Sequence, residues 1–249
     1  MRGKGFDKIL LVTLGLGFLI VCFAVLVLTL RDLYMEVKLD KEIDIVQNTL
    51  NKEKIDEKEL DKILNRDTVS GSYSKIEKAY KDNIKSIMKL VNNIKDFNNE
   101  VNLEDTFKAD NLKNDGPEFI STKEKIKNYQ EFYEKNNKEL KKIKEDESLW
   151  SYLPEKKSSK FDQNYLKYNI LKVFRMKYIK NITNDFSNKK ALLDQADTMI
   201  TFLEENKEDW KIKEEITFKT ESLGTEYQKM NKKWEDLLAG KRPIIKIGE

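Results

Sequence analysis

The sequence contains no histidine, and its single cysteine, Cys22, lies within an apolar run. These absences exclude histidine-based acid–base catalysis, Ser-His-Asp and Cys-His triads, and zinc sites built from cysteine or histidine. They also exclude an intramolecular disulfide, so the fold must be stabilised by packing alone. The sequence has no glycine-rich phosphate loop and no acidic loop with metal-ligand spacing. We therefore expect a protein that is not an enzyme and that has no cofactor and no bound metal.

Helix-breaking residues are scarce: the 249 residues include only three prolines and nine glycines. A strand-rich fold needs many turns, so this scarcity favours long helices. Aromatic residues make up 10% of the chain, enough to supply the apolar area that offsets the entropy lost on folding. Abundant lysine, asparagine and isoleucine, with few arginines, are typical of AT-rich coding and predict a bacterial source.

The formal net charge of +3 comes mainly from the N-terminus. The first 30 residues contain Arg2, Lys4, Lys8 and Asp7, which leaves 44 basic and 43 acidic residues in the remainder. A nearly neutral domain produces no bulk field that would attract a polyanion. We therefore expect no nucleic-acid partner.

An uncharged, apolar run of 22 residues extends from Ile9 to Leu30. As a helix it would span roughly 33 Å, enough to cross a hydrocarbon core of about 30 Å. The basic residues in front of it predict a cytoplasmic N-terminus and an extracytoplasmic remainder, so the predicted location is the cell membrane, with a single span. The alternatives are a lipoprotein signal at Cys22 and a cleaved signal peptide. We favour the uncleaved anchor because Val21 is large for a lipidation site and the run exceeds a signal-peptide core.

The spacing of apolar residues divides the rest of the chain into helices. We expect an all-α fold, in which the transmembrane helix is followed by an antiparallel bundle of about four to six helices. The predicted organisation is a cytoplasmic tail (1–8), a transmembrane helix (9–30), a stalk with a short helix (31–70), a helical-bundle ectodomain (71–240) and a C-terminal tail (241–249).

Capping residues predict where several helices start. Asp56 opens a capping box in front of a short helix. Ser72 is the expected N-cap of the clearest helix, whose apolar stripe extends over 73–94. A further helix is expected to start at Pro117, a residue suited to the first helical position, and to continue to Asp146.

Three more helices are predicted towards the C-terminus. The segment Lys160–Asn184 has apolar residues on nearly every face, so we expect one helix at the centre of the bundle. A separate helix is expected around Leu192. A last helix is expected from about Glu221 to Leu238, ended by Gly240.

Residues 210–219 fit two structures. In a hairpin with a three-residue loop, Trp210 would lie opposite Phe218 and Ile212 opposite Ile216, with all four side chains on one face. The same residues also fit the apolar stripe of a helix that continues towards the C-terminus. We favour the hairpin.

One stretch resembles a known group of proteins. The residues that carry the resemblance are Asn206, Lys207, Glu208, Asp209, Trp210, Ile212, Ile216, Phe218, Glu226 and Tyr227. They are similar to the C-terminal portion of bacterial surface proteins in which an N-terminal anchor or lipobox precedes a helical bundle. The resemblance covers about a tenth of the chain. It implies the same architecture and no particular activity.

Basic and aromatic residues alternate over 160–180, where Asp162 is the only acid. Together they could bind an anionic wall polymer or lipid headgroups through ion pairs and cation–π contacts. Trp150 and Tyr152 could add a recognition loop. In the competing interpretation the lysines meet acids on neighbouring helices and the aromatic loop covers the end of the core. The candidate binding surface comprises Trp150, Tyr152, Lys160, Lys167, Tyr168, Lys172, Arg175, Lys177, Tyr178 and Lys180.

The expected function is that of an interaction or scaffold module of the bacterial cell envelope, with an envelope protein or wall polymer as its partner. Two alternatives remain: a ligand-sensing ectodomain that signals through a membrane partner, and a carboxylate-dependent wall hydrolase. The hydrolase is the weakest of the three. Adjacent carboxylates such as Glu204 and Glu205 point about 100° apart on a helix, and such pairs are expected by chance in a chain with 44 acids. The sequence leaves the oligomeric state open.

Overall fold

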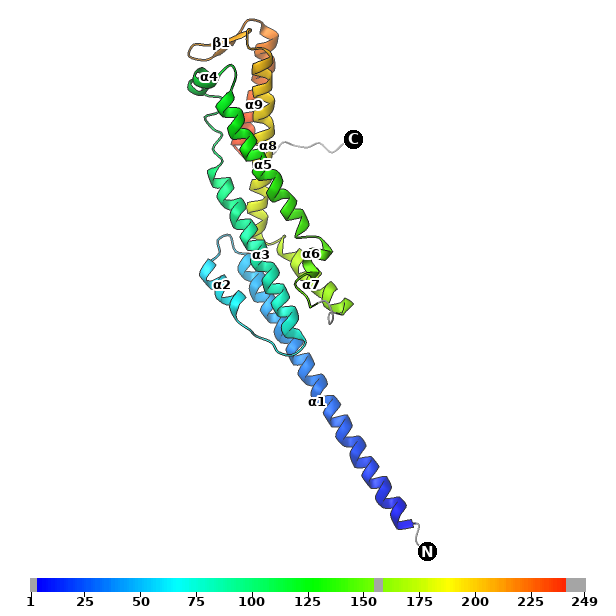
Figure 1. The fold of residues 1–249 in the computed structure, drawn as a ribbon. Coiled ribbons are helices and arrows are strands. Elements are labelled where there is room, and N and C mark those ends of the chain that lie inside the picture. The colour runs from blue at the N-terminus through cyan, green and yellow to red at the C-terminus, as the bar shows by residue number, and fades with distance from the viewer. Residues whose placement is uncertain (1–3, 155–158, 241–249) are drawn as a thin grey trace.

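The computed structural model describes residues 4–154 and 159–240, with side chains from Leu14 onward; the predicted tail at 241–249 lies outside these residues. Helices dominate and one small hairpin completes the fold, which confirms the predicted all-α class (Figure 1). The elements in chain order are α1 (Lys4–Leu50), α2 (Glu57–Asn65), α3 (Tyr73–Glu100), α4 (Ala109–Asp115), α5 (Ile120–Lys142), α6 (Asp146–Trp150), α7 (Lys160–Val173), α8 (Lys177–Glu205), β1 (Trp210–Ile212), β2 (Ile216–Phe218) and α9 (Glu221–Leu238).

Helix α1 joins the apolar run to the bundle without a break. Among the described residues it is the one helix long and apolar enough to cross a membrane: its most apolar window has a mean hydropathy of 2.4, and none of that window is buried. Further along, Leu39, Ile43, Val46 and Leu50 bury one face of α1 in the bundle. The candidate anchor and the first helix of the bundle therefore form one continuous rod.

The core consists of two clusters that follow each other along the bundle (Figure 1). The proximal cluster, nearer the N-terminal end of the chain, comes from α1, α2, α6, α7, the first half of α3 and the start of α8. The distal cluster comes from α4, α5, the hairpin, α9, the second half of α3 and the rest of α8. Helices α3 and α8, with 28 and 29 residues, are each roughly 42–44 Å long. Because they contribute to both clusters, they join the two halves into one body.

The helices of the distal half alternate in direction. Figure 1 shows α3 and α8 running away from the N-terminal end of α1, whereas α5 and α9 run back towards it. In the proximal half, by contrast, α1, α3 and α7 run the same way. The chain after α1 must therefore return towards the N-terminal end of the molecule before α3 starts. Helix α2 makes the first part of this return, with Glu57 at its start 3.7 Å from Lys95 of α3, and residues 66–72 complete it beside Lys81.

One of the two predicted N-caps in this region is confirmed. The Asp56 carboxylate accepts hydrogen bonds from the amides of Lys58 and Glu59, at 2.9 and 3.2 Å. The prediction for Ser72 is wrong: its side chain makes no capping hydrogen bond, and its backbone is already helical, with φ −61° and ψ −38°. The turn before α3 is made by Gly71, whose φ of +72° is a left-handed conformation that suits glycine.

The predicted start of the next long helix is also wrong. Helix α5 begins at Ile120 rather than at Pro117, because Phe119 adopts a left-handed φ of 48° and cannot belong to the helix. The Asp115 carboxylate caps α5 from a distance along the chain, accepting two amide hydrogen bonds of its first turn at 3.0 and 2.7 Å. The helix also ends at Lys142 rather than at the predicted Asp146, where the separate short helix α6 begins.

The predicted single helix over 160–184 is wrong as well. The chain breaks at 174–176 between α7 and α8, and the separate helix expected after it is the second half of α8. At the break, Met176 is extended, with φ −66° and ψ 142°, and the Lys177 amide donates to Asn51 Oδ1 at 3.2 Å. The change of direction buries most of the apolar residues that had suggested a helix with no polar face, although Tyr168 stays exposed.

The hairpin is confirmed with the predicted register. Trp210 lies opposite Phe218 and Ile212 opposite Ile216. All four side chains are half-buried and pack against the distal cluster. The Trp210 indole donates to the Leu203 carbonyl at 2.7 Å, which ties the hairpin to the end of α8.

Candidate functional site

The structure divides the predicted basic and aromatic surface among several elements, because the break at 174–176 prevents one shared helix face. Helix α7 carries Lys160, Lys167, Tyr168 and Lys172, and the break contains Arg175. The first turn of α8 carries Lys177, Tyr178 and Lys180. Helix α6 ends at Trp150, and Tyr152 follows it.

Two of the predicted basic residues form ion pairs. Lys167 lies 2.6 Å from Asp146 on α6. Lys177 pairs with Glu53, and its hydrogen bond lowers the pKa of that carboxyl. These pairs agree with the interpretation in which lysines meet acids on neighbouring elements. The basic residues that form no ion pair with any described part of the chain are Lys160, Lys172, Arg175 and Lys180.

Most of the predicted aromatic residues belong to the core or its edge. Tyr178 is buried, and Trp150 is half-buried against the proximal cluster. Tyr152 is partly exposed, and its hydroxyl lies 2.7 Å from the Ser86 hydroxyl. Of these four aromatic residues only Tyr168 is largely exposed. The structure therefore does not gather the predicted residues into one surface.

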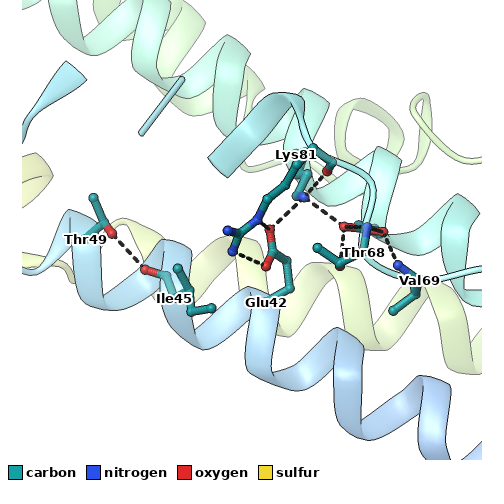
Figure 2. A network of polar contacts seen from close by, with 8 residues as sticks. Glu42, Ile45, Thr49, Thr68, Val69 and Lys81 are labelled. Atoms are coloured by element: carbon teal, nitrogen blue, oxygen red, sulfur yellow. Dashed lines mark hydrogen bonds and ion pairs between the residues drawn. The ribbon is translucent and has the colours of Figure 1, made fainter. Parts of the chain in front are cut away.

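A network of four charged side chains, of which all but Arg66 are buried, connects α1 to α3 (Figure 2). The Lys81 ammonium lies 2.8 Å from the carboxylates of both Glu42 and Glu77, and it donates to the Arg66 carbonyl at 2.6 Å. These contacts use all three of its protons. The Arg66 guanidinium binds Glu42 through two nitrogens, at 2.9 and 2.6 Å. With two cations and two carboxylates, the network is neutral as a whole.

The same network holds the chain segment that leads into α3. The Glu77 carboxylate accepts hydrogen bonds from the amides of Thr68 and Val69 and from the Thr68 hydroxyl, at 2.6 to 3.1 Å. Burial by itself would raise the pKa of Glu42 and Glu77, but hydrogen bonds from their partners outweigh it and lower both pKa values. A fully satisfied buried network specifies one arrangement of the elements that it joins. We interpret it as a rigid joint between α1 and the bundle.

A groove of about 810 Å³ lies at the end of the bundle farthest from the N-terminal helix. It is bounded by the chain around α4, by the hairpin loop and β2, and by the first half of α9. The Phe218 and Tyr227 rings lie against each other in it, with centroids 5.3 Å apart. The buried and half-buried apolar side chains that line the groove are Phe107, Ala109, Leu112, Ile216, Phe218 and Tyr227.

The exposed edge of the groove is polar and acidic. Glu214, Glu215 and Glu221 contribute three carboxylates, whereas the single basic residue, Lys219, lies 3.4 Å from Asp209. Within the described residues, no group of three acidic or cysteine side chains is placed to hold a metal ion. The groove therefore combines an apolar floor with a negatively charged edge. Its uncharged polar side chains are Thr217, Thr220, Thr225, Gln228 and Asn231.

The fold and the groove define a class of protein: a helical bundle on one apolar helix that could cross a membrane, with a groove at its far end. No family model, curated protein or solved structure matches the chain. The resemblance over 206–227 therefore adds no functional argument, and the function must be inferred from geometry.

The groove and the buried network were both missed by sequence reasoning. Glu77 and Lys81 are four residues apart and adjoin the apolar stripe of α3, so their spacing was a usable signal for a buried pair. Their partner Glu42 likewise adjoins Ile43 on the buried face of α1. The groove gave no such signal, because its walls come from three segments that sequence spacing cannot place together.

Proposed function

We propose that the protein is a membrane-anchored interaction module of the cell envelope. In this proposal α1 spans the membrane with its N-terminus in the cytoplasm, and the distal groove binds a polypeptide segment with basic and apolar side chains. The observation that carries the proposal is the lining of the groove, an apolar floor edged by three carboxylates at the end of the bundle opposite α1. The floor favours hydrophobic side chains, and the edge favours positive ones.

A polypeptide fits the groove better than an anionic wall polymer does. The three carboxylates of the edge would repel a polyanion. Strand β2, which lines the groove, belongs to a sheet of two strands, so one of its edges has no strand beside it in the described fold. An extended segment could therefore add main-chain hydrogen bonds to its side-chain contacts.

Site-specific photo-crosslinking in intact cells tests the proposal. A photoreactive amino acid at Thr225, inside the groove, should capture a protein partner, whereas the same amino acid at Lys233, on an exposed part of α9 outside the groove, should not. The double change Glu214→Lys and Glu221→Lys reverses the charge of the edge and should abolish the product. A matched double change on α5, Glu131→Lys and Glu134→Lys, should leave it intact. Equal capture at the two photoreactive positions, or none at Thr225, would contradict the proposal.

A ligand-sensing function is the second candidate, because the groove volume of about 810 Å³ falls within the range of small-molecule sites, roughly 300–1,000 Å³. In that case, small cationic metabolites should raise the unfolding temperature of the full chain in detergent. The Glu214→Lys and Glu221→Lys variant should lose this stabilisation. Stabilisation of this kind, without a crosslinked partner at Thr225, would favour sensing over scaffolding.

A further inference from the structure

The part of α1 that follows the apolar run has an apolar face that the bundle does not cover. Leu33, Tyr34 and Val37 are 56%, 60% and 45% exposed. The bundle instead packs against the opposite face of α1, through residues such as Leu39 and Ile43. Outside a membrane, such a run of exposed apolar side chains usually marks an interaction site.

This face continues a stripe that starts within the apolar run. Leu26, Leu30, Leu33 and Val37 follow one another at steps of four, three and four residues, the 3.5-residue repeat of a coiled-coil seam. All four side chains are about half exposed, at 45% to 57%. Because α1 is unbroken, the stripe continues about 10 Å beyond Leu30.

We propose that two copies of the chain pair in parallel along this seam, from within the membrane to about two helical turns outside it. A partner that covers both parts of the seam must leave the bilayer beside α1 and in the same direction. A second copy, related by a two-fold axis along the membrane normal, meets this condition because it presents the same stripe to the first.

The charges beside the seam complement each other in such a pair. In the heptad that places Leu33 and Val37 in the seam, Glu36 and Lys41 occupy the flanking positions and are five residues apart. In a parallel pair, these two positions of opposite copies lie side by side. The Glu36 carboxylate also meets the Tyr73 hydroxyl, and its two oxygens can serve both partners.

Acidic residues mark where the seam ends. The next two positions of the repeat are Asp40 and Asp44. Asp40 accepts a hydrogen bond from the Tyr165 hydroxyl of α7, and Asp44 would face its own copy across the two-fold axis. We therefore expect the two α1 helices to separate after Val37.

Helix α7 supplies a second apolar surface beside α1. Phe161, Tyr165 and Tyr168 follow at steps of four and three residues and form one stripe. Tyr165 bonds to α1 at Asp40, whereas Phe161 and Tyr168 remain 62% and 69% exposed. A second copy along the seam would cover part of this stripe. The pair would also carry two distal grooves, which raises the effective affinity for a repetitive or dimeric partner.

Disulfide crosslinking of the full chain in lipid vesicles tests the pairing. In a Cys22→Ser background, Leu33→Cys and Val37→Cys should form dimers rapidly on mild oxidation, because seam residues come within reach of a disulfide. Lys38→Cys is the matched control, since it is exposed next to Val37 but lies off the seam. Equal crosslinking at positions 37 and 38, or no dimer at positions 33 and 37, would overturn the proposal.

A charge swap tests the register of the pair separately. Glu36→Lys or Lys41→Glu alone should weaken dimerisation about tenfold, about threefold for each of the two symmetry-related exposed ion pairs, and the two changes together should restore it. Energy transfer between labelled chains in vesicles measures the dimer fraction. Two single changes that leave this fraction unaltered, or a double change that fails to restore it, would exclude the parallel register. The pairing requires α1 to cross the membrane and does not depend on the groove.

Discussion

Lys81→Met removes the ammonium group at the centre of the buried network while retaining most of the aliphatic volume of the side chain. The lysine is only 4% exposed, so water cannot readily replace it as a partner. Glu42 would keep Arg66, but Glu77 would lose the one cation that pairs with it in the described structure. Removal of one member of a buried ion pair costs about 3–5 kcal/mol. That cost is a large share of a total stability of about 5–15 kcal/mol.

Urea unfolding of the full chain in a non-ionic detergent, followed by circular dichroism, measures the effect. The matched control is Lys85→Met, one turn further along α3, where the lysine is 42% exposed and lies 3.7 Å from Asp82. This exposed pair should contribute about 0–1 kcal/mol. A second change, Glu77→Gln, should recover part of the loss in the Lys81→Met protein because it removes the unpaired charge. If Lys81→Met were no more destabilising than Lys85→Met, the network could not be the joint described above.

Three further predictions concern single positions. Gly116→Ala should lower the unfolding temperature, because a Cβ atom there would lie 2.5 Å from the Leu112 carbonyl oxygen. Gly224→Ala should raise the unfolding temperature, because its Cβ atom would meet nothing within 4 Å and alanine stabilises a helix by about 0.5–1 kcal/mol relative to glycine. Asp115→Ala should lower the free energy of unfolding by about 1 kcal/mol and speed amide hydrogen exchange in the first turn of α5. The pKa of Glu77 lies below its ordinary 4.5, so its ionised form stabilises the folded state fully above pH 4.5. This contribution to the free energy of unfolding should be lost as the pH falls through the lowered pKa, and urea unfolding at decreasing pH measures the loss.

The elements that the sequence predicts well are those fixed by neighbours along the chain. The hairpin register follows from alternation together with the three-residue loop at 213–215, which pairs Trp210 with Phe218 and Ile212 with Ile216. The stripe of α3 likewise follows from the helical period. In both cases the side chains that determine the structure lie within a few residues of one another.

Most of the failures come from contacts between distant segments. The break before α8 depends on Asn51, which accepts a hydrogen bond from the Lys177 amide although 126 residues separate them. The start of α5 depends on the left-handed Phe119 and on a cap supplied by Asp115. The predicted basic and aromatic surface assumed one helix across 174–176, so the break there dispersed it over several elements. No local pattern could have predicted the break or the dispersal of the surface.

Because α1 is unbroken and α3 is long, a rotation of α1 moves the far end of the bundle by a larger distance. Tyr73, at the start of α3, meets Glu36, which lies about 9 Å beyond Leu30 along α1. Helix α3 extends about 42 Å further, so its far end lies about 50 Å from the end of the apolar run. If α1 spans a bilayer, a change in its tilt of about 20° would sweep the groove sideways by roughly 17 Å. Bilayer thickness influences helix tilt, so it would then determine how far from the anchor, in the plane of the membrane, the groove can reach a partner.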